Sequence, residues 1–119
     1  MKHIRLNGII AAVGLAVMML LSAQSQAGAY YDGSKLLQLC ESDSAGECGA
    51  CVGYIVGIVD SHDTMVKVTE VPMFCQPENA TAGQLVKVVT KYLNEHPEDL
   101  HYSASSEVYG ALMEAFPCS

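Results

Sequence analysis

Cysteines are the residues of this chain best suited to covalent chemistry. Five are present, and Cys48 and Cys51 are separated by two residues, which is the spacing of thiol–disulfide oxidoreductases and of zinc knuckles. A zinc site of that kind needs a second close pair, but Cys40, Cys75 and Cys118 stand apart from one another. A redox motif needs a βαβ pattern, whereas the residues after Cys51 have helical periodicity. We therefore predict structural cysteines and no metal ligands, and we keep an oxidoreductase using Cys48 and Cys51 as an alternative.

A second group that could do chemistry is the acidic stretch around His62. Asp60 and Asp63 flank this histidine, but residues two positions apart do not share a helix face, and such a group at a helix end is usually a solvated surface. The sequence signatures of zinc peptidases, serine hydrolases, P-loop proteins and dinucleotide-binding proteins are all missing. These observations predict a protein that is not an enzyme, has no catalytic residue and uses no cofactor.

The charge of the chain excludes one class of partner. The 119 residues are enough for one domain, and their formal net charge is −7. All thirteen acidic residues but only four lysines lie after residue 28, so that part carries a charge of −9. Binding to nucleic acid needs a basic face for the phosphates and, for single strands, aromatic stacking platforms, yet the chain has no Trp. We predict no nucleic-acid partner.

The first 27 residues have the three parts of a secretory signal peptide. A short basic start precedes thirteen uncharged residues at positions 9–21 and then a small, polar stretch. A membrane span needs about 20 apolar residues, and this run is shorter. We therefore expect export with cleavage after Ala27 or Ala29, no membrane attachment after cleavage, and a single helical domain at residues 28–119.

The exported part is predicted to be all-α, because four segments have apolar residues at helical spacing. Thr81 and Gln84 have the pattern of a capping box, and Ser34 is the expected N-cap of the first helix. Residues 65–71 fit either a short extended edge or the end of the second helix. The expected fold is a small disulfide-linked bundle of four to five helices, of which four cover residues 34–40, 49–61 with an extension up to 66, 81–96 and 103–116.

Three glycines recur at every fourth position of the second predicted helix, namely Gly49, Gly53 and Gly57. Each lowers helix propensity by roughly 1 kcal/mol relative to alanine, and together they form a flat strip that another helix can approach closely. We interpret this strip as a surface for tight packing, either inside the domain or across a homodimer.

The predicted topology indicates how the cysteines pair. The helices at 81–96 and 103–116 are joined by a short connection and form an antiparallel hairpin, which brings Cys75 near Cys118. By the same reasoning the end of the first helix at Cys40 meets the start of the second at Cys51, and Cys48 is left as a free thiol. A Cys40–Cys48 bond with Cys51 free is the close competitor.

Several segments resemble, in their order along the chain, one bacterial family. They are Leu36-Leu37-x-x-Cys40, the stretch CVGYIVGIVD that starts at Cys51, Phe74-Cys75-Gln76-Pro77, the helical residues 81–93, His96-Pro97-Glu98 and the closing Ala115-Phe116-Pro117-Cys118. This order is similar to that of the Rap/Tai group of periplasmic immunity proteins, which neutralise peptidoglycan amidases injected by type VI secretion systems. The resemblance covers nearly all of the exported part, with Cys48 as an addition, and implies an all-helical and often dimeric protein.

The resemblance also implies a function. It predicts a periplasmic protein that binds a secreted cell-wall amidase, a Cys–His enzyme, and blocks its active site, with the acidic charge speeding association with a basic partner. Two stretches are expected to supply the contact, and the partner-binding candidates are His96, Glu98, Asp99, His101 and Tyr102 in one and Asp60 and Asp63 in the other. An acid-stress periplasmic chaperone is the main alternative, because protonation of thirteen carboxylates would reverse the net charge.

Overall fold

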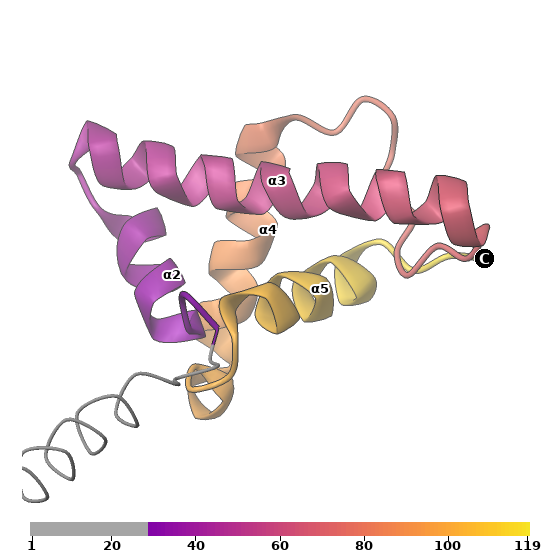
Figure 1. Cartoon of the computed structure of the whole chain (residues 1–119). Coiled ribbons are helices and arrows are strands. Elements are labelled where there is room, and N and C mark those ends of the chain that lie inside the picture. The colour runs from indigo at the N-terminus through magenta and orange to yellow at the C-terminus, as the bar shows by residue number, and fades with distance from the viewer. Residues whose placement is uncertain (1–28) are drawn as a thin grey trace, which may run out of the picture.

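The computed structural model describes residues 29–119, and this part of the chain is all-α (Figure 1). Its elements are α2 (Gly33–Glu41), α3 (Ala45–Thr69), α4 (Ala82–Glu95), the 3₁₀ helix η1 (Pro97–Asp99) and α5 (Ala104–Ala115). No strand forms among these residues, and the predicted disulfide-linked helical bundle is confirmed. None of the helices described is long and apolar enough to cross a membrane. The predicted signal peptide lies outside the described residues.

Side-chain caps define where three of the four α-helices begin, and the caps of α2 and α4 test the sequence predictions. The Thr81 hydroxyl accepts a hydrogen bond from the Gln84 N–H at 3.2 Å, while Gln84 Oε1 accepts one from the Thr81 N–H at 2.8 Å, so the predicted capping box starts α4. The predicted cap of the first helix is wrong. Asp32 rather than Ser34 caps α2, because its carboxylate lies 2.8 Å from the N–H of Lys35 and accepts that hydrogen bond.

The helix α3 is longer at both ends than the periodicity predicted. Of the two interpretations left for residues 65–71, the helical one holds as far as Thr69. The β-branched residues in this segment have low helix propensity, but the Lys67 ammonium lies 2.6 Å from the Asp63 carboxylate one turn earlier and supports the helix locally. The helix ends where Glu70 adopts a left-handed backbone with a φ of 59°.

The four α-helices enclose one apolar core, with the long α3 crossing α4 and with α2 and α5 on the same side of α3 (Figure 1). Burial of one such aliphatic side chain stabilises the fold by about 1.5–3 kcal/mol. Side chains at the centre of the core come from all four helices and include Leu36, Ile55, Val89, Leu93, Val108 and Leu112.

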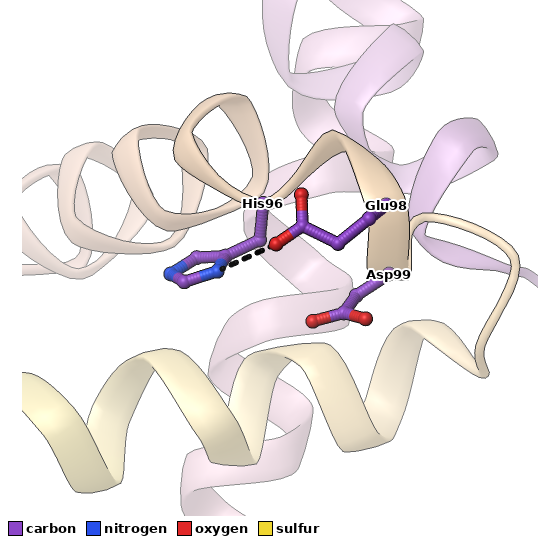
Figure 2. A group of neighbouring side chains, drawn as sticks. All are labelled: His96, Glu98 and Asp99. Carbon is purple, nitrogen blue, oxygen red and sulfur yellow. Dashed lines mark ion pairs between the residues drawn. The ribbon is translucent and has the colours of Figure 1, made fainter.

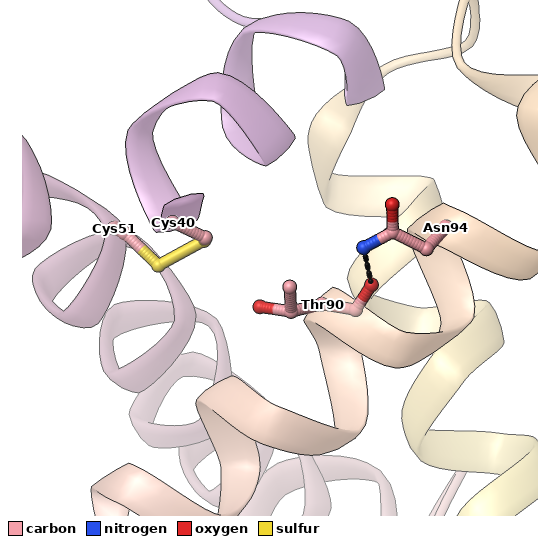
Figure 3. Close-up of a disulfide and its surroundings, with 4 residues drawn as sticks. All are labelled: Cys40, Cys51, Thr90 and Asn94. Atoms are coloured by element: carbon pink, nitrogen blue, oxygen red, sulfur yellow. Dashed lines mark hydrogen bonds between the residues drawn. A yellow bond between two sulfur atoms is a disulfide. The ribbon is translucent and has the colours of Figure 1, made fainter. Parts of the chain in front are cut away.

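Two disulfides join the ends of the helices. Cys40 at the end of α2 is bonded to Cys51 in α3 (Figure 3), and Cys75 in the loop after α3 is bonded to Cys118 beyond α5. Both predicted pairs are confirmed, and the competing Cys40–Cys48 pair is wrong. Cys48 is an exposed free thiol, as predicted.

The glycine strip, formed by Gly49, Gly53 and Gly57, faces away from the core. All three glycines are exposed, and a Cβ atom at any of them would meet no other atom within 4 Å. Tight packing of the strip inside the domain is therefore wrong. The reason is that the buried residues Cys51 and Ile55 lie on the opposite side of α3 and occupy the interface with the other helices. The homodimer role stays a prediction.

Candidate functional site

The residues predicted to contact a partner lie in two places that the fold keeps apart. Residues 96–102, named here the η1 turn, join α4 to the start of α5, whereas Asp60 and Asp63 lie in the second half of α3. This half of α3 runs toward the carboxyl end of α5, away from the η1 turn (Figure 1). Each group is therefore a separate candidate surface.

Three side chains of the η1 turn lie close together (Figure 2). His96 closes α4, because its N–H donates to the Tyr92 carbonyl at 3.0 Å, and its ring lies against the Tyr92 ring with centroids 4.2 Å apart. Pro97 begins the 3₁₀ helix that follows. His96 Nδ1 lies 3.6 Å from Glu98 Oε1, and the ligand atoms of His96, Glu98 and Asp99 all lie within 4.8 Å of one another.

His101 and Tyr102 form the exposed edge of the η1 turn. Their ring centroids lie 4.1 Å apart, and Tyr102 is 53% exposed. The turn is held from the side of α2, since the Gly33 N–H donates to the Tyr102 carbonyl and the Ser34 N–H donates to the Leu100 carbonyl, each at 3.0 Å. A Cβ atom at Gly33 would lie 3.1 Å from Leu100 Cα, so glycine allows α2 to approach the turn this closely.

Glu107 is a residue that the sequence patterns did not single out. It lies in α5, its side chain is only 5% exposed, and its Oε2 atom has no hydrogen-bond partner. Burial raises the pKa of the Glu107 carboxyl and the charge of Asp99 raises it further, while His96 and His101 lower it. The sequence did contain an indication that Glu107 is buried. Glu107 follows Ala104 by three residues and therefore lies on the apolar face of α5.

In the second half of α3 the acidic residues are exposed, but the histidine between them is buried. Asp60 and Asp63 face solvent. The prediction that His62 lies on a solvated face is wrong, because its side chain is 6% exposed. Its ring stacks on Phe74 with centroids 3.8 Å apart, and its Nε2 atom accepts a hydrogen bond from the Met73 N–H at 3.0 Å. His62 therefore holds the loop that follows α3.

The end of α3 and this loop expose an apolar surface, named here the α3 tip and formed by Val68, Val71 and Met73. These side chains are 80%, 64% and 44% exposed. Several exposed apolar side chains within one short stretch are a candidate interaction site. The sequence interpretation considered Asp60 and Asp63 for their acidic charge and missed the apolar part, because the valines at positions 65–71 also matched a short strand.

Cys48 and Cys51 do not form a redox pair in this fold. Cys51 is fully buried and bonded to Cys40, while Cys48 is exposed and free. The described residues contain no strand, so the motif lies in no βαβ unit. The oxidoreductase alternative therefore lacks the dithiol on which it depended.

The described helices thus form a rigid scaffold that presents an acidic turn at one end and an apolar tip at the other, which is the arrangement of a protein that acts by binding. The comparison with protein families agrees with this class. The chain belongs to the Rap1a immunity proteins, whose family model matches residues 32–118. No curated protein matches it. Membership confirms the resemblance found in the sequence, and it implies a protein that protects by binding a secreted effector.

Proposed function

We propose that this protein is a periplasmic immunity protein that binds a peptidoglycan amidase delivered by a type VI secretion system and blocks its active site. The observation that carries this proposal is the family match, which spans all the described helices and both disulfides. The predicted signal peptide supports export to the compartment that holds peptidoglycan. Disulfides suit the oxidising chemistry of that compartment.

The α3 tip has the composition expected at the centre of an interface. Val68, Val71 and Met73 supply apolar surface, and the exposed acid Glu70 lies between the two valines in the chain. An apolar centre with a polar rim is the usual order in protein–protein interfaces. We therefore assign the α3 tip as the part that enters the cleft of the amidase.

The loop of the α3 tip is held in place before any partner binds. His62 accepts the Met73 N–H, and the Cys75 N–H donates to the Phe116 carbonyl at 2.8 Å. The disulfide between Cys75 and Cys118 adds a covalent link to the end of the chain. A preorganised loop loses less conformational entropy on binding, which favours affinity.

The η1 turn is the second proposed contact. It carries the exposed ring of Tyr102 beside the acids Glu98 and Asp99, and exposed aromatic residues frequently anchor interfaces. The charge of −9 on the residues after position 28 favours rapid association with a basic effector. Asp60 and Asp63 add to this charge on the side of the α3 tip.

Co-expression with the cognate amidase, directed to the periplasm, tests the function. The native protein is expected to prevent lysis and to elute in a complex with the amidase on size-exclusion chromatography. The double variant Val71→Asp/Met73→Asp is expected to lose protection. Met113→Asp is the matched control, because Met113 is exposed to a similar degree (39%) but lies on α5.

Each result has a definite meaning. Lysis in the presence of the native protein, with no complex formed, would contradict the proposed function. Protection that survives in the double variant but is lost in Tyr102→Ala would move the contact to the η1 turn. Suppression of the aggregation of unrelated proteins at acid pH would instead support the chaperone alternative.

We also propose that the glycine strip is the contact between two copies of the chain. Its three glycines are exposed and leave a flat surface on α3, which allows two helices to pack closely. Gly53→Arg is expected to give a monomer in light scattering, while Gly83→Arg, an exposed glycine at the start of α4, is expected to leave a dimer. A native protein that is monomeric at micromolar concentration would remove this part of the proposal.

A further inference from the structure

We propose that the η1 turn binds a divalent cation of the zinc class through His96, Glu98 and Asp99, above the buried carboxyl group of Glu107. This inference is independent of the proposed immunity function, since it rests on the side chains of the turn and on Glu107 in α5. One imidazole nitrogen with carboxylate oxygens is a donor set that suits zinc. Calcium and magnesium prefer sites made only of oxygen.

The three donors converge on one side of the turn (Figure 2). Their ligand atoms lie within 4.8 Å of one another. Bonds of about 2.0–2.2 Å to zinc place tetrahedral ligand atoms about 3.4 Å apart, so the side chains need to close by roughly 1.5 Å at most. The Glu98 side chain is 66% exposed and free to rotate, whereas that of His96 is 30% exposed. The flexible donor can therefore close onto the fixed one.

The fixed donor is His96. Its backbone N–H ends α4 by donating to the Tyr92 carbonyl, and its ring lies against the ring of Tyr92. Pro97 then constrains the backbone of the turn that carries Glu98 and Asp99. A ligand whose ring is oriented by its surroundings loses little freedom when it binds a cation.

Glu107 is the independent observation that points to a cation at this place. Its side chain is 5% exposed, and Oε2 has no hydrogen-bond partner. Glu107 lies beside the turn, as the surroundings of Gly33 show. A Cβ atom added to Gly33 would lie 3.2 Å from Glu107 Cγ and 3.1 Å from the Cα of Leu100 in the turn. A buried carboxylate without a partner is costly. A cation held by the turn would supply the missing positive charge.

The charged groups that act on the Glu107 carboxyl also belong to the turn. They are Asp99, His96 and His101. Two of these three residues are proposed ligands, so the Glu107 carboxyl in α5 lies within electrostatic range of the cluster. In the described residues this is the group of histidine and acidic side chains whose ligand atoms lie near enough to close onto one ion.

Calorimetric titration and thermal unfolding of protein produced from the full-length chain test the site. A Cys48→Ser background removes the exposed thiol, which could bind zinc by itself. Zinc chloride is expected to bind with a stoichiometry of one and to raise the melting temperature, while magnesium and calcium chlorides at the same concentration have no effect. His96→Gln and Asp99→Asn are expected to weaken zinc binding at least about 10-fold, and Glu107→Gln by a smaller factor.

His101→Gln is the matched control, because this exposed histidine lies in the same turn but outside the cluster of three donors. Its zinc affinity is expected to equal that of the parent protein. Zinc binding that is absent from the parent, or unchanged in both His96→Gln and Asp99→Asn, would overturn the proposal. Because His96→Gln also removes the ring that lies against Tyr92, Asp99→Asn serves as the variant that keeps this contact at the end of α4.

Discussion

The imidazole of His62 lies against the ring of Phe74, with the ring centroids 3.8 Å apart and the planes 18° from parallel. On its other side, His62 Nε2 accepts the N–H of Met73 at 3.0 Å. A third ring, that of Tyr109 in α5, meets His62 edge-on at 6.2 Å. One buried histidine of α3 thus joins the helix, the loop of the α3 tip and α5.

This contact predicts that His62→Ala destabilises the fold by roughly 2–3 kcal/mol, because the change removes a buried ring and leaves the Met73 N–H without its acceptor. Urea unfolding followed by circular dichroism measures the free energy. Asp60→Ala, two residues away and exposed, is expected to change it by less than about 0.5 kcal/mol. Equal effects of the two substitutions would show that the His62 contacts do not contribute to the free energy of unfolding.

The approach of α2 to the η1 turn gives a second prediction. Gly33→Ala is expected to cost about 1–3 kcal/mol, since its Cβ would lie 3.1 Å from backbone atoms of Leu100 that cannot move independently. Gly46 lies in the first turn of α3, and a Cβ atom there would be 3.9 Å from the nearest atom. Gly46→Ala is therefore expected to raise the free energy of unfolding by up to about 1 kcal/mol. Thermal unfolding of both variants should therefore shift in opposite directions.

The disulfides differ in the length of chain that they close. The Cys75–Cys118 bond spans 43 residues and the Cys40–Cys51 bond 11, for which the chain-entropy treatment gives about 4 and about 3 kcal/mol. Replacing both cysteines of a pair with serine is expected to cost more for the first pair. Cys48→Ser should leave the free energy of unfolding within about 0.5 kcal/mol of the native value. A large loss in Cys48→Ser would indicate that the free thiol has been assigned to the wrong cysteine.

The raised pKa of Glu107 gives a dependence of stability on pH. Because the folded pKa lies above the ordinary value of 4.5, the unfolded chain releases this proton first as the pH rises, and Glu107 then lowers the stability of the fold. Glu107→Gln is expected to be more stable than the native protein at neutral pH. The difference should shrink as the pH falls through the folded pKa and disappear below 4.5.

Unfolding of both proteins at several pH values in the presence of EDTA, which keeps metal ions out of the η1 turn, measures this difference. A difference that is the same at every pH would come from the shape of the amide and not from ionisation, and would contradict the prediction.

Much of the fold was predictable from short stretches of sequence. The Thr81–Gln84 capping box, the apolar stripes and the stops at Pro97 and Pro117 act between residues no more than a few positions apart, so a helix of this kind is encoded locally. The disulfide pairs followed from placing those helices as hairpins. The length of α3 was underestimated, because its β-branched end is supported by an ion pair between Asp63 and Lys67 that propensity alone does not include.

The sequence by itself determined an acidic, all-helical chain of the immunity-protein type, and it predicts export. Only the tertiary structure decided which polar residues are buried and which apolar ones are exposed. Glu107 is enclosed where α2 and the η1 turn meet α5, and His62 is enclosed by the loop after α3 and by Tyr109 of α5. The glycine strip and the α3 tip are exposed, because none of the other described helices covers them. Whether a polar group is buried depends on which elements pack against it. The periodicity of one helix shows its apolar face but not which elements will cover it.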